Sequence, residues 1–324
     1  MPTVETVRGP LDVSALGTTL MHEHVFVLST EYVENFGHPW WDEEERVTDA
    51  VAKLNELKSL GVDTIVDPTV WGLGRYIPRV QRVAEQTDLN IIVATGLYTY
   101  DEIPHQYEHR GPGLLIDLPR DPMIEDFSGD LTTGIAGTGV RAAFLKCVLE
   151  AKGLTPGVER NLRACAAVHR ETGAPITVHT SSTTQAGRTL LELFREEDVD
   201  LTKVVIGHAG DSNDLDYLKE MADSGAILGM DRFGLDIYNP TPSRVDTIAA
   251  LASAGYADRM VLAHDASCFI DYFPGEAEAA LRQAAPNWNF THISTDVLPM
   301  LRERGVTEAH LTQMLVDTPR RYFE

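Results

Sequence analysis

Two histidines separated by one residue stand near the start of the chain, inside a run of apolar residues. The stretch TLMHEHVF (19–26) has the character of a β-strand, so His22 and His24 share one face and Glu23 takes the other. Two imidazoles on one face are typical of half a metal site, although two hydrogen-bonded core histidines fit the same pattern. The rest of such a site has to come from elsewhere in the chain.

Further side chains able to bind a metal ion stand at the ends of other apolar runs. They are Lys146 in AAFLKCV, His179 in PITVHT, His208 in KVVIGH, and the pair His264 and Asp265 in RMVLAHD. One strand histidine alone is more often a core residue, but core packing does not explain the same ending on several separate runs. A lysine within an apolar run is costly to bury as a cation unless it is salt-bridged or snorkels, and a buried lysine loses its proton readily.

Eight apolar runs alternate with amphipathic segments along the chain. The runs are 19–26, 62–67, 90–96, 142–148, 175–180, 203–208, 225–231 and 259–265. Helical patterns fill the gaps, with the clearest at 42–61 and 155–173 and others near 186–198, 211–224, 243–254 and 295–304. This alternation predicts parallel βαβ units.

Eight such units predict a closed (β/α)8 TIM barrel, in which the carboxyl ends of the strands form the active-site face. The metal-binding side chains named above would therefore meet at that face. An open doubly wound sheet is the alternative, but the glycine-rich phosphate fingerprint is missing after the first run.

Composition limits the class of protein. The 324 residues are 43% hydrophobic and 23% charged, and we expect one domain spanning 1–324. A net charge of -22 argues against nucleic acid and against anionic membranes as partners. Three scattered cysteines without CxxC spacing, no membrane-span-like run and no signal-peptide pattern predict a cytoplasmic protein.

Together, TLMHEHVF, the lysine of FLKCV, VHT, GHAGD and LAHDASC resemble the phosphotriesterase family of the amidohydrolase superfamily, and within it the phosphotriesterase-like lactonases. The resemblance covers nearly the whole chain. It implies a binuclear metal centre: His22, His24 and Asp265 hold a buried ion, His179 and His208 hold an exposed ion, and carbamylated Lys146 bridges the two. Zinc is the expected metal, with cobalt, manganese or iron as alternatives.

The resemblance also implies an activity. We expect hydrolysis of N-acyl-homoserine lactones (quorum quenching) and of other lactones by a metal-bridging hydroxide, with promiscuous phosphotriesterase activity. Asp265 would orient the hydroxide and accept its proton, Tyr98 would donate a hydrogen bond near the metals, and Arg232 would lie at the pocket mouth. Rim packing of Tyr98 and an ion pair of Arg232 with Asp231 or another acid are the plainer alternatives. His264 and Glu23 are expected to be structural.

The long segment 266–290 is rich in aromatic residues and is expected to be a loop that lines an apolar channel for the acyl chain, unless its aromatics fold inward. The alternative main activity is hydrolysis of organophosphate triesters, which the short connection between 231 and 259 disfavours. A non-catalytic barrel is disfavoured because the set of ligands is complete, and no G-x-S-x-G motif supports a serine route. The resemblance further implies a homodimer and a small neutral substrate with an apolar tail.

Overall fold

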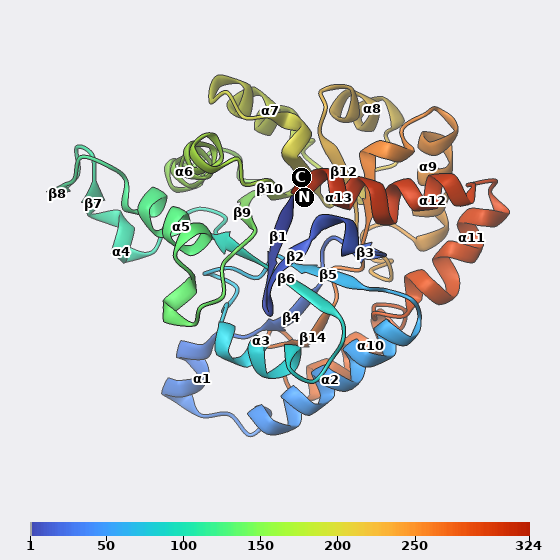
Figure 1. Cartoon of the computed structure of the whole chain (residues 1–324), viewed down its shortest axis with the longest axis horizontal. Coiled ribbons are helices and arrows are strands. Elements are labelled where there is room, and N and C mark those ends of the chain that lie inside the picture. The colour runs from blue at the N-terminus through green and yellow to red at the C-terminus, as the bar shows by residue number, and fades with distance from the viewer. Residues whose placement is uncertain (1) are drawn as a thin grey trace.

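The computed structural model describes residues 2–324 and confirms the predicted barrel. Eight strands follow one another in the order β3, β5, β6, β9, β10, β11, β12, β13, and neighbouring strands run parallel, with the helices outside them (Figure 1). Their bounds are Thr19–Leu20, Thr64–Asp67, Asn90–Gly96, Phe144–Leu149, Ile176–Thr180, Val204–Gly207, Ile227–Met230 and Met260–Leu262.

The first predicted strand is divided in two. β3 ends at Leu20, and β4 (His24–Val27) pairs with β14 (Ser267–Ile270), a strand that belongs to a separate small sheet. Between them, residues 21–23 form no strand. Three backbone hydrogen bonds connect this break to the end of β13: Met21 N to Leu262 O (3.2 Å), Asp265 N to His22 O (3.0 Å) and His24 N to Ala266 O (2.8 Å). These bonds close the barrel at its seam.

Helices occupy the predicted intervals. α2 begins after Asp42, whose side chain accepts a hydrogen bond from Glu45 N, and three glutamates in its first turn complement the helix dipole. α6 begins after Thr155 and ends at Gly173, which has a left-handed conformation. The helices are α1 Thr30–Phe36, α2 Glu43–Ser59, α3 Ile77–Ala84, α4 His105–Glu108, α5 Pro122–Thr132, α6 Pro156–Thr172, α7 Gly187–Glu196, α8 Leu215–Asp223, α9 Thr241–Ser253, α10 Glu276–Ala284, α11 Leu298–Glu303, α12 Glu308–Thr312 and α13 Thr318–Phe323.

The amino end of the barrel is sealed by packing. The hairpin of β1 (Thr3–Thr6) and β2 (Gly9–Asp12) lies across it, and both chain ends meet there (Figure 1). Tyr322 of α13 enters from below, with its hydroxyl 2.9 Å from Thr177 Oγ1. Above it, one layer of buried apolar side chains fills the barrel interior: Met21, Val66, Ile92, Phe144, Val205, Ile227 and Val261. With this end filled, the carboxyl ends of the strands are left as the face that can hold a site.

The segment 266–290 is more regular than predicted. It is not an irregular loop, because it contains β14 and α10. Period-2 and period-3.6 patterns are hard to recognise in segments of four and nine residues, and β14 forms through its pairing with β4. Trp288 is folded inward, and its indole Nε1 donates to His264 O (3.0 Å) and Asp265 O (3.1 Å).

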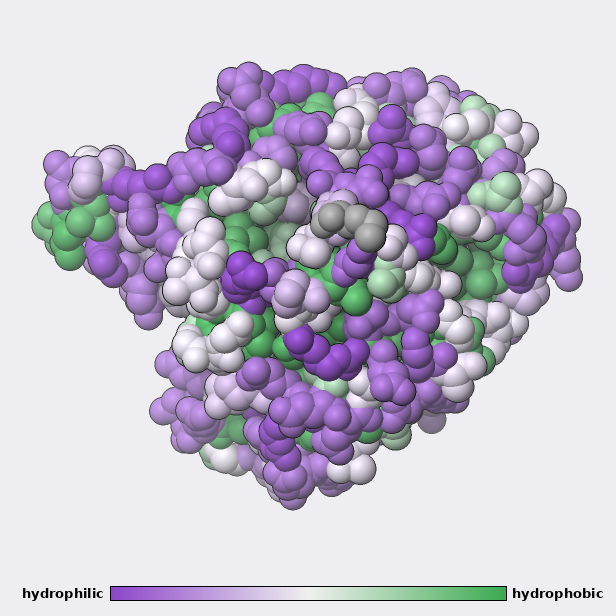
Figure 2. Space-filling view, in the orientation of Figure 1, coloured by the Kyte–Doolittle hydropathy of each residue, from purple (hydrophilic) through white to green (hydrophobic). Residues whose placement is uncertain are grey.

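One lobe stands away from the barrel. It carries β7 (Arg110–Gly111) and β8 (Ile116–Asp117), and an apolar patch covers its end (Figures 1 and 2). Leu114, Leu115 and Ile116 are exposed there. Within residues 2–324, no helix has both the length and the apolar character needed to cross a lipid bilayer. The homodimer and the cytoplasmic location stay predictions.

Candidate metal centre

The barrel brings the six predicted ligands to one end. His22 lies in the break after β3, His24 opens β4, Lys146 is in β9 and His179 is in β10, while His208 directly follows β11 and Asp265 is the third residue after β13. His22 Nε2 and His24 Nε2 lie 3.4 and 3.2 Å from Asp265 Oδ1. His179 Nδ1 lies 2.9 Å from His208 Nε2. Side chains from five separate strands therefore meet, as the sequence predicted, and their role as ligands stays a prediction.

The histidines turn one ring nitrogen toward each other and hydrogen-bond through the second. His24 Nδ1 donates to Thr69 Oγ1 (2.7 Å), because that hydroxyl gives its own proton to Asp67 (2.5 Å). His179 Nε2 lies 2.8 Å from Glu150 Oε1. Such outer bonds fix the tautomer and leave the inner nitrogen with a lone pair, which is the form that binds a metal ion.

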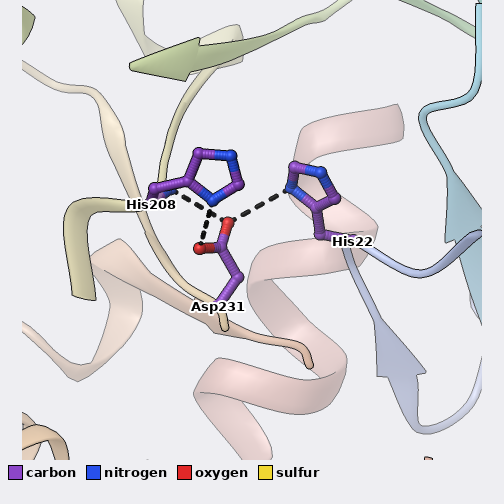
Figure 3. A group of neighbouring side chains, drawn as sticks. All are labelled: His22, His208 and Asp231. Atoms are coloured by element: carbon purple, nitrogen blue, oxygen red, sulfur yellow. Dashed lines mark hydrogen bonds and ion pairs between the residues drawn. The ribbon is translucent and has the colours of Figure 1, made fainter. Parts of the chain in front are cut away.

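Asp231, at the end of β12, performs the same task for His208 and lies close to the ring of His22 (Figure 3). Its Oδ1 lies 2.8 Å from His208 Nδ1, and its Oδ2 lies 3.2 Å from His22 Nδ1 and accepts from His208 N (3.0 Å). Gly229 makes room for this carboxylate, since a Cβ there would stand 3.0 Å from Asp231 Oδ2. The sequence analysis considered Asp231 only as a partner of Arg232. The ending GMD, which parallels AHD on the next strand, was the available signal.

Two groups have ligand atoms within 4.8 Å of one another: His22, His24 and Asp265, and His22, His208 and Asp231. In the second group both Asp231 oxygens receive N–H groups, so it orients the histidines. The first group directs imidazole Nε2 atoms at a carboxylate that faces the cavity, and it is the better candidate for holding an ion.

The buried amine of Lys146 lacks a hydrogen-bond partner among the described residues. The side chain is only 1% exposed. Burial lowers the pKa of Lys146 to about 8, although Asp265 and Asp231 oppose the shift. An unsatisfied buried amine of this kind is costly in a site that binds nothing, and it fits a site that binds cations and modifies the amine.

Burial also favours the neutral form of His22, His179 and His208. It lowers the pKa of His179 to about 4, and it lowers the pKa values of His22 and His208. Burial alone would raise the pKa of Asp265, but the neighbouring histidines and Arg232 hold it well below its usual range. Near neutral pH the site thus offers uncharged imidazoles beside an ionised carboxylate, a donor set that fits zinc and similar divalent ions.

Arg232 and Tyr98 line the same cavity as the candidate ligands, and their roles stay predictions. Arg232 Nε donates to Asp265 Oδ2 (3.1 Å), and its Nη1 donates to Asp211 Oδ2 (2.9 Å), so its acidic partners are these two residues. The Tyr98 hydroxyl lies 3.3 Å from His179 Nδ1 and 2.6 Å from the Tyr100 hydroxyl. Burial raises the pKa of Tyr98, so the phenol keeps its proton and can donate it in a hydrogen bond.

A cavity of about 310 Å³ opens above these residues. Its wall includes five of the predicted ligands, together with Tyr98 and Arg232, and its outer part is largely apolar: Val27, Leu73, Leu235, Ile237, Ile270, Phe273, Leu281 and Trp288. A larger cavity of about 1010 Å³ lies beside the lobe. It contains no predicted ligand, and its arginines are paired with acids, as in Arg160 with Asp121. The chemistry belongs to the smaller cavity.

We expect Lys146→Met to stabilise the metal-free protein at pH 7 by about 1–3 kcal/mol, because it removes a buried amine whose charged form is unpaired. The same variant should lose most of its bound zinc. Chemical unfolding of chelator-treated protein and metal analysis measure the two effects. Lys152→Met is the control, since this lysine is exposed and should change stability by less than about 0.5 kcal/mol. A destabilised Lys146→Met protein would contradict the prediction.

We expect the metal-free protein to lose stability as the pH falls from about 6.5 to about 4. Between these pH values His179 binds a proton in the unfolded state but stays neutral in the folded state, where the ring is buried. The free energy of unfolding therefore decreases with decreasing pH. His179 alone accounts for up to about 3 kcal/mol. Urea unfolding at pH 7 and pH 5 measures the slope, which should be smaller in His179→Gln. An equal slope in both proteins would refute the assignment.

Comparison with known proteins gives the family. The model of the phosphotriesterase family matches residues 2–323. A "phosphotriesterase homology protein" of Mycobacterium tuberculosis is 52% identical over 100% of this chain and 98% of its own length. An "aryldialkylphosphatase" of Saccharolobus solfataricus is 35% identical over 95% of each chain. The solved structure of the phosphotriesterase from Mycobacterium tuberculosis superposes with a TM-score of 0.96 at 52% identity, covering 100% of this chain and 98% of that one. The chain therefore belongs to the phosphotriesterase family and is a hydrolase of that family.

Proposed function

We propose that the protein is a metal-dependent lactonase that hydrolyses N-acyl-homoserine lactones and related lactones with an apolar tail. The observation that carries this proposal is the position of a largely apolar cavity directly over the buried His, Lys and Asp donors. A neutral ester with a hydrocarbon tail matches such a wall, because burying each methylene contributes about 0.8 kcal/mol. Hydrolysis of N-acyl-homoserine lactones would give the protein a quorum-quenching activity.

The donors support two metal ions. His22, His24 and Asp265 would hold one ion, and His179 and His208, whose inner nitrogens face each other, would hold the second. Lys146 would join them as a carbamate, formed when its unprotonated Nζ adds to CO2 and releases a proton. Its lack of any hydrogen-bond partner supports this modification, since the carbamate oxygens would take part in ligation. Bound divalent ions supply Lewis acidity and lower the pKa of water.

The protein's own residues would handle the substrate and its protons. Asp265 is ionised and is held by Arg232, so it can accept a proton and later return it to the leaving alkoxide. The Tyr98 hydroxyl keeps its proton and faces the same centre, where it can donate a hydrogen bond to the oxygen that gains charge. Arg232 is neutralised by two aspartates, so the wall favours a neutral substrate over an anionic one.

A second cavity of about 320 Å³ lies beside the first and shares five residues of its wall: Ser267, Ile270, Phe273, Leu281 and Trp288. The rest of its wall includes the charged side chains Lys53, Glu56, Glu278 and Arg282. A long acyl tail would therefore pack against the apolar side chains that the two walls share. A compact phosphotriester with several short arms would contact fewer of them.

Phosphotriester hydrolysis is the second candidate. The name of the Saccharolobus relative, an aryldialkylphosphatase, favours it, and the same metal ions serve attack at phosphorus or at carbon. We expect it as the weaker activity of this chain, because the apolar outer wall of the first cavity gives a long acyl tail more contact area than it gives a triester.

The deciding experiment is a comparison of kcat/KM on one metal-replete preparation. The substrates are N-acyl-homoserine lactones of increasing chain length, γ- and δ-lactones without long tails, and one aryl dialkyl phosphate. We expect a long-chain lactone to exceed the phosphotriester by at least about a hundredfold, which corresponds to ~2.7 kcal/mol of transition-state binding. A phosphotriester with the higher kcat/KM would reverse the order of the two candidates.

We expect Leu281→Trp to lower kcat/KM for long-chain lactones by about tenfold or more, since the indole would fill space along the apolar wall that the two cavities share. Short-chain lactones should be affected less than about threefold. Ile237→Trp is the matched control, because Ile237 lines only the first cavity and is 68% exposed. Equal losses for long and short chains in Leu281→Trp would show that the tail does not pass this residue.

A further inference from the structure

The seam of the barrel is where three of the proposed ligands lie. His22 and His24 stand at the break between β3 and β4, and Asp265 follows β13. Among residues 2–324, β13 forms a ladder only with β12, so the seam lacks the regular strand pairing found around the rest of the barrel. Three backbone hydrogen bonds cross the seam there, and a side-chain connection adds to them in holding the candidate ligands on its two sides.

Glu23 makes this connection. Its side chain is completely buried and points away from the cavity. Oε1 accepts hydrogen bonds from His264 N (2.8 Å) and His264 Nδ1 (2.7 Å), and Oε2 accepts one from Ala266 N (3.2 Å). The two backbone donors flank Asp265. One carboxylate, placed between His22 and His24 in the sequence, thus holds the backbone on both sides of Asp265 across the seam.

His264 completes the connection without supplying a positive charge. Its Nε2 accepts a hydrogen bond from Ile293 N (2.9 Å), at the start of the π-helical turn Ile293–Val297. A ring nitrogen that accepts a hydrogen bond carries no proton, so Nδ1 is the donor to Glu23 and the ring is neutral. His264 is also the only ion-pair partner of Glu23 in the described part of the chain. The carboxylate is therefore buried without a compensating cation from the protein.

We propose that Glu23 is a positioning residue of the metal centre: through His264 N, His264 Nδ1 and Ala266 N it fixes Asp265 relative to His22 and His24, and its uncompensated charge favours a cation at those ligands. The inference rests on the proposed metal-dependent function. It assigns to Glu23 and His264 more than the structural role expected from the sequence, although neither residue touches the ion.

Glu23→Gln tests the proposal. The amide keeps one acceptor but loses the charge, and its NH2 group cannot accept from Ala266 N. We expect the dissociation constant for Zn²⁺, measured by competition with a chromophoric chelator in bicarbonate buffer, to rise about 10- to 100-fold. The control is Thr177→Val, which breaks the buried bond to Tyr322 at the opposite end of the barrel and should leave Zn²⁺ affinity unchanged. Unchanged affinity in Glu23→Gln, or an equal loss in the control, would overturn the proposal.

A second pair of variants applies if Glu23→Gln does not fold. His264→Leu removes the ring donor to Glu23, whereas His264→Asn places an amide N–H where Nδ1 stands. We expect a loss of Zn²⁺ affinity of about tenfold in the first and recovery to within about threefold in the second. Equal losses in both would overturn the proposal. The measurement of Zn²⁺ affinity needs no substrate, so a negative lactonase assay would leave the proposed role of Glu23 standing. A wild-type chain that binds no Zn²⁺ would instead refute the metal centre itself.

Discussion

The site depends on one constraint: each imidazole buried at the carboxyl end of the barrel has to hydrogen-bond through one ring nitrogen so that the other is free. Asp231, Glu150 and Thr69 meet this requirement for His208, His179 and His24, while His22 Nδ1 lies 3.2 Å from Asp231 Oδ2 without a hydrogen bond among the described residues. Because burial also lowers the pKa values of His179 and His208, the lone pairs of His179 Nδ1 and His208 Nε2 face each other at 2.9 Å without a proton between them. Such an arrangement is costly in the absence of a cation and becomes favourable when one is bound, which links the stability of the site to its chemistry.

The sequence was sufficient for the barrel and for its six candidate ligands because strand ends repeat at regular intervals and imidazoles at those ends are rare. It was not sufficient for Asp231 and Glu150, since they are two among 49 acidic residues and only the fold shows that they face a ring nitrogen. The break at residues 21–23 was not predicted either, because an apolar run does not show that the backbone at its centre will hydrogen-bond across the seam of the barrel. Likewise β14 is a strand through its long-range pairing with β4.

The apolar residues expected to select the substrate and the candidate metal ligands come from different parts of the barrel. The polar side chains lie on strand ends and are fixed by neighbouring strands, whereas the apolar wall, apart from Val27 of β4, comes from the segments after β5, β12 and β13. Within the connection after β12, the Arg232 guanidinium lies 4.7 Å from the ring of Tyr238. Substitutions in these connections can therefore change the shape of the cavity without moving a ligand.

Backbone conformation shows how the strand ends are held. His208, Arg232 and Asp265 all have left-handed backbones, with φ values of 62°, 63° and 54°, and each costs about 1 kcal/mol or more in a residue with a Cβ. Each is held by an acid from another strand or turn: Asp231 binds His208 N, Asp211 binds the Arg232 guanidinium, and Glu23 binds both neighbours of Asp265. Asp211 is itself held by the buried Arg244, which also donates to Asp231 O (2.9 Å). Buried acids therefore hold the strained turns that carry His208, Arg232 and Asp265, and the direction of the three side chains depends on these acids as well as on the strands.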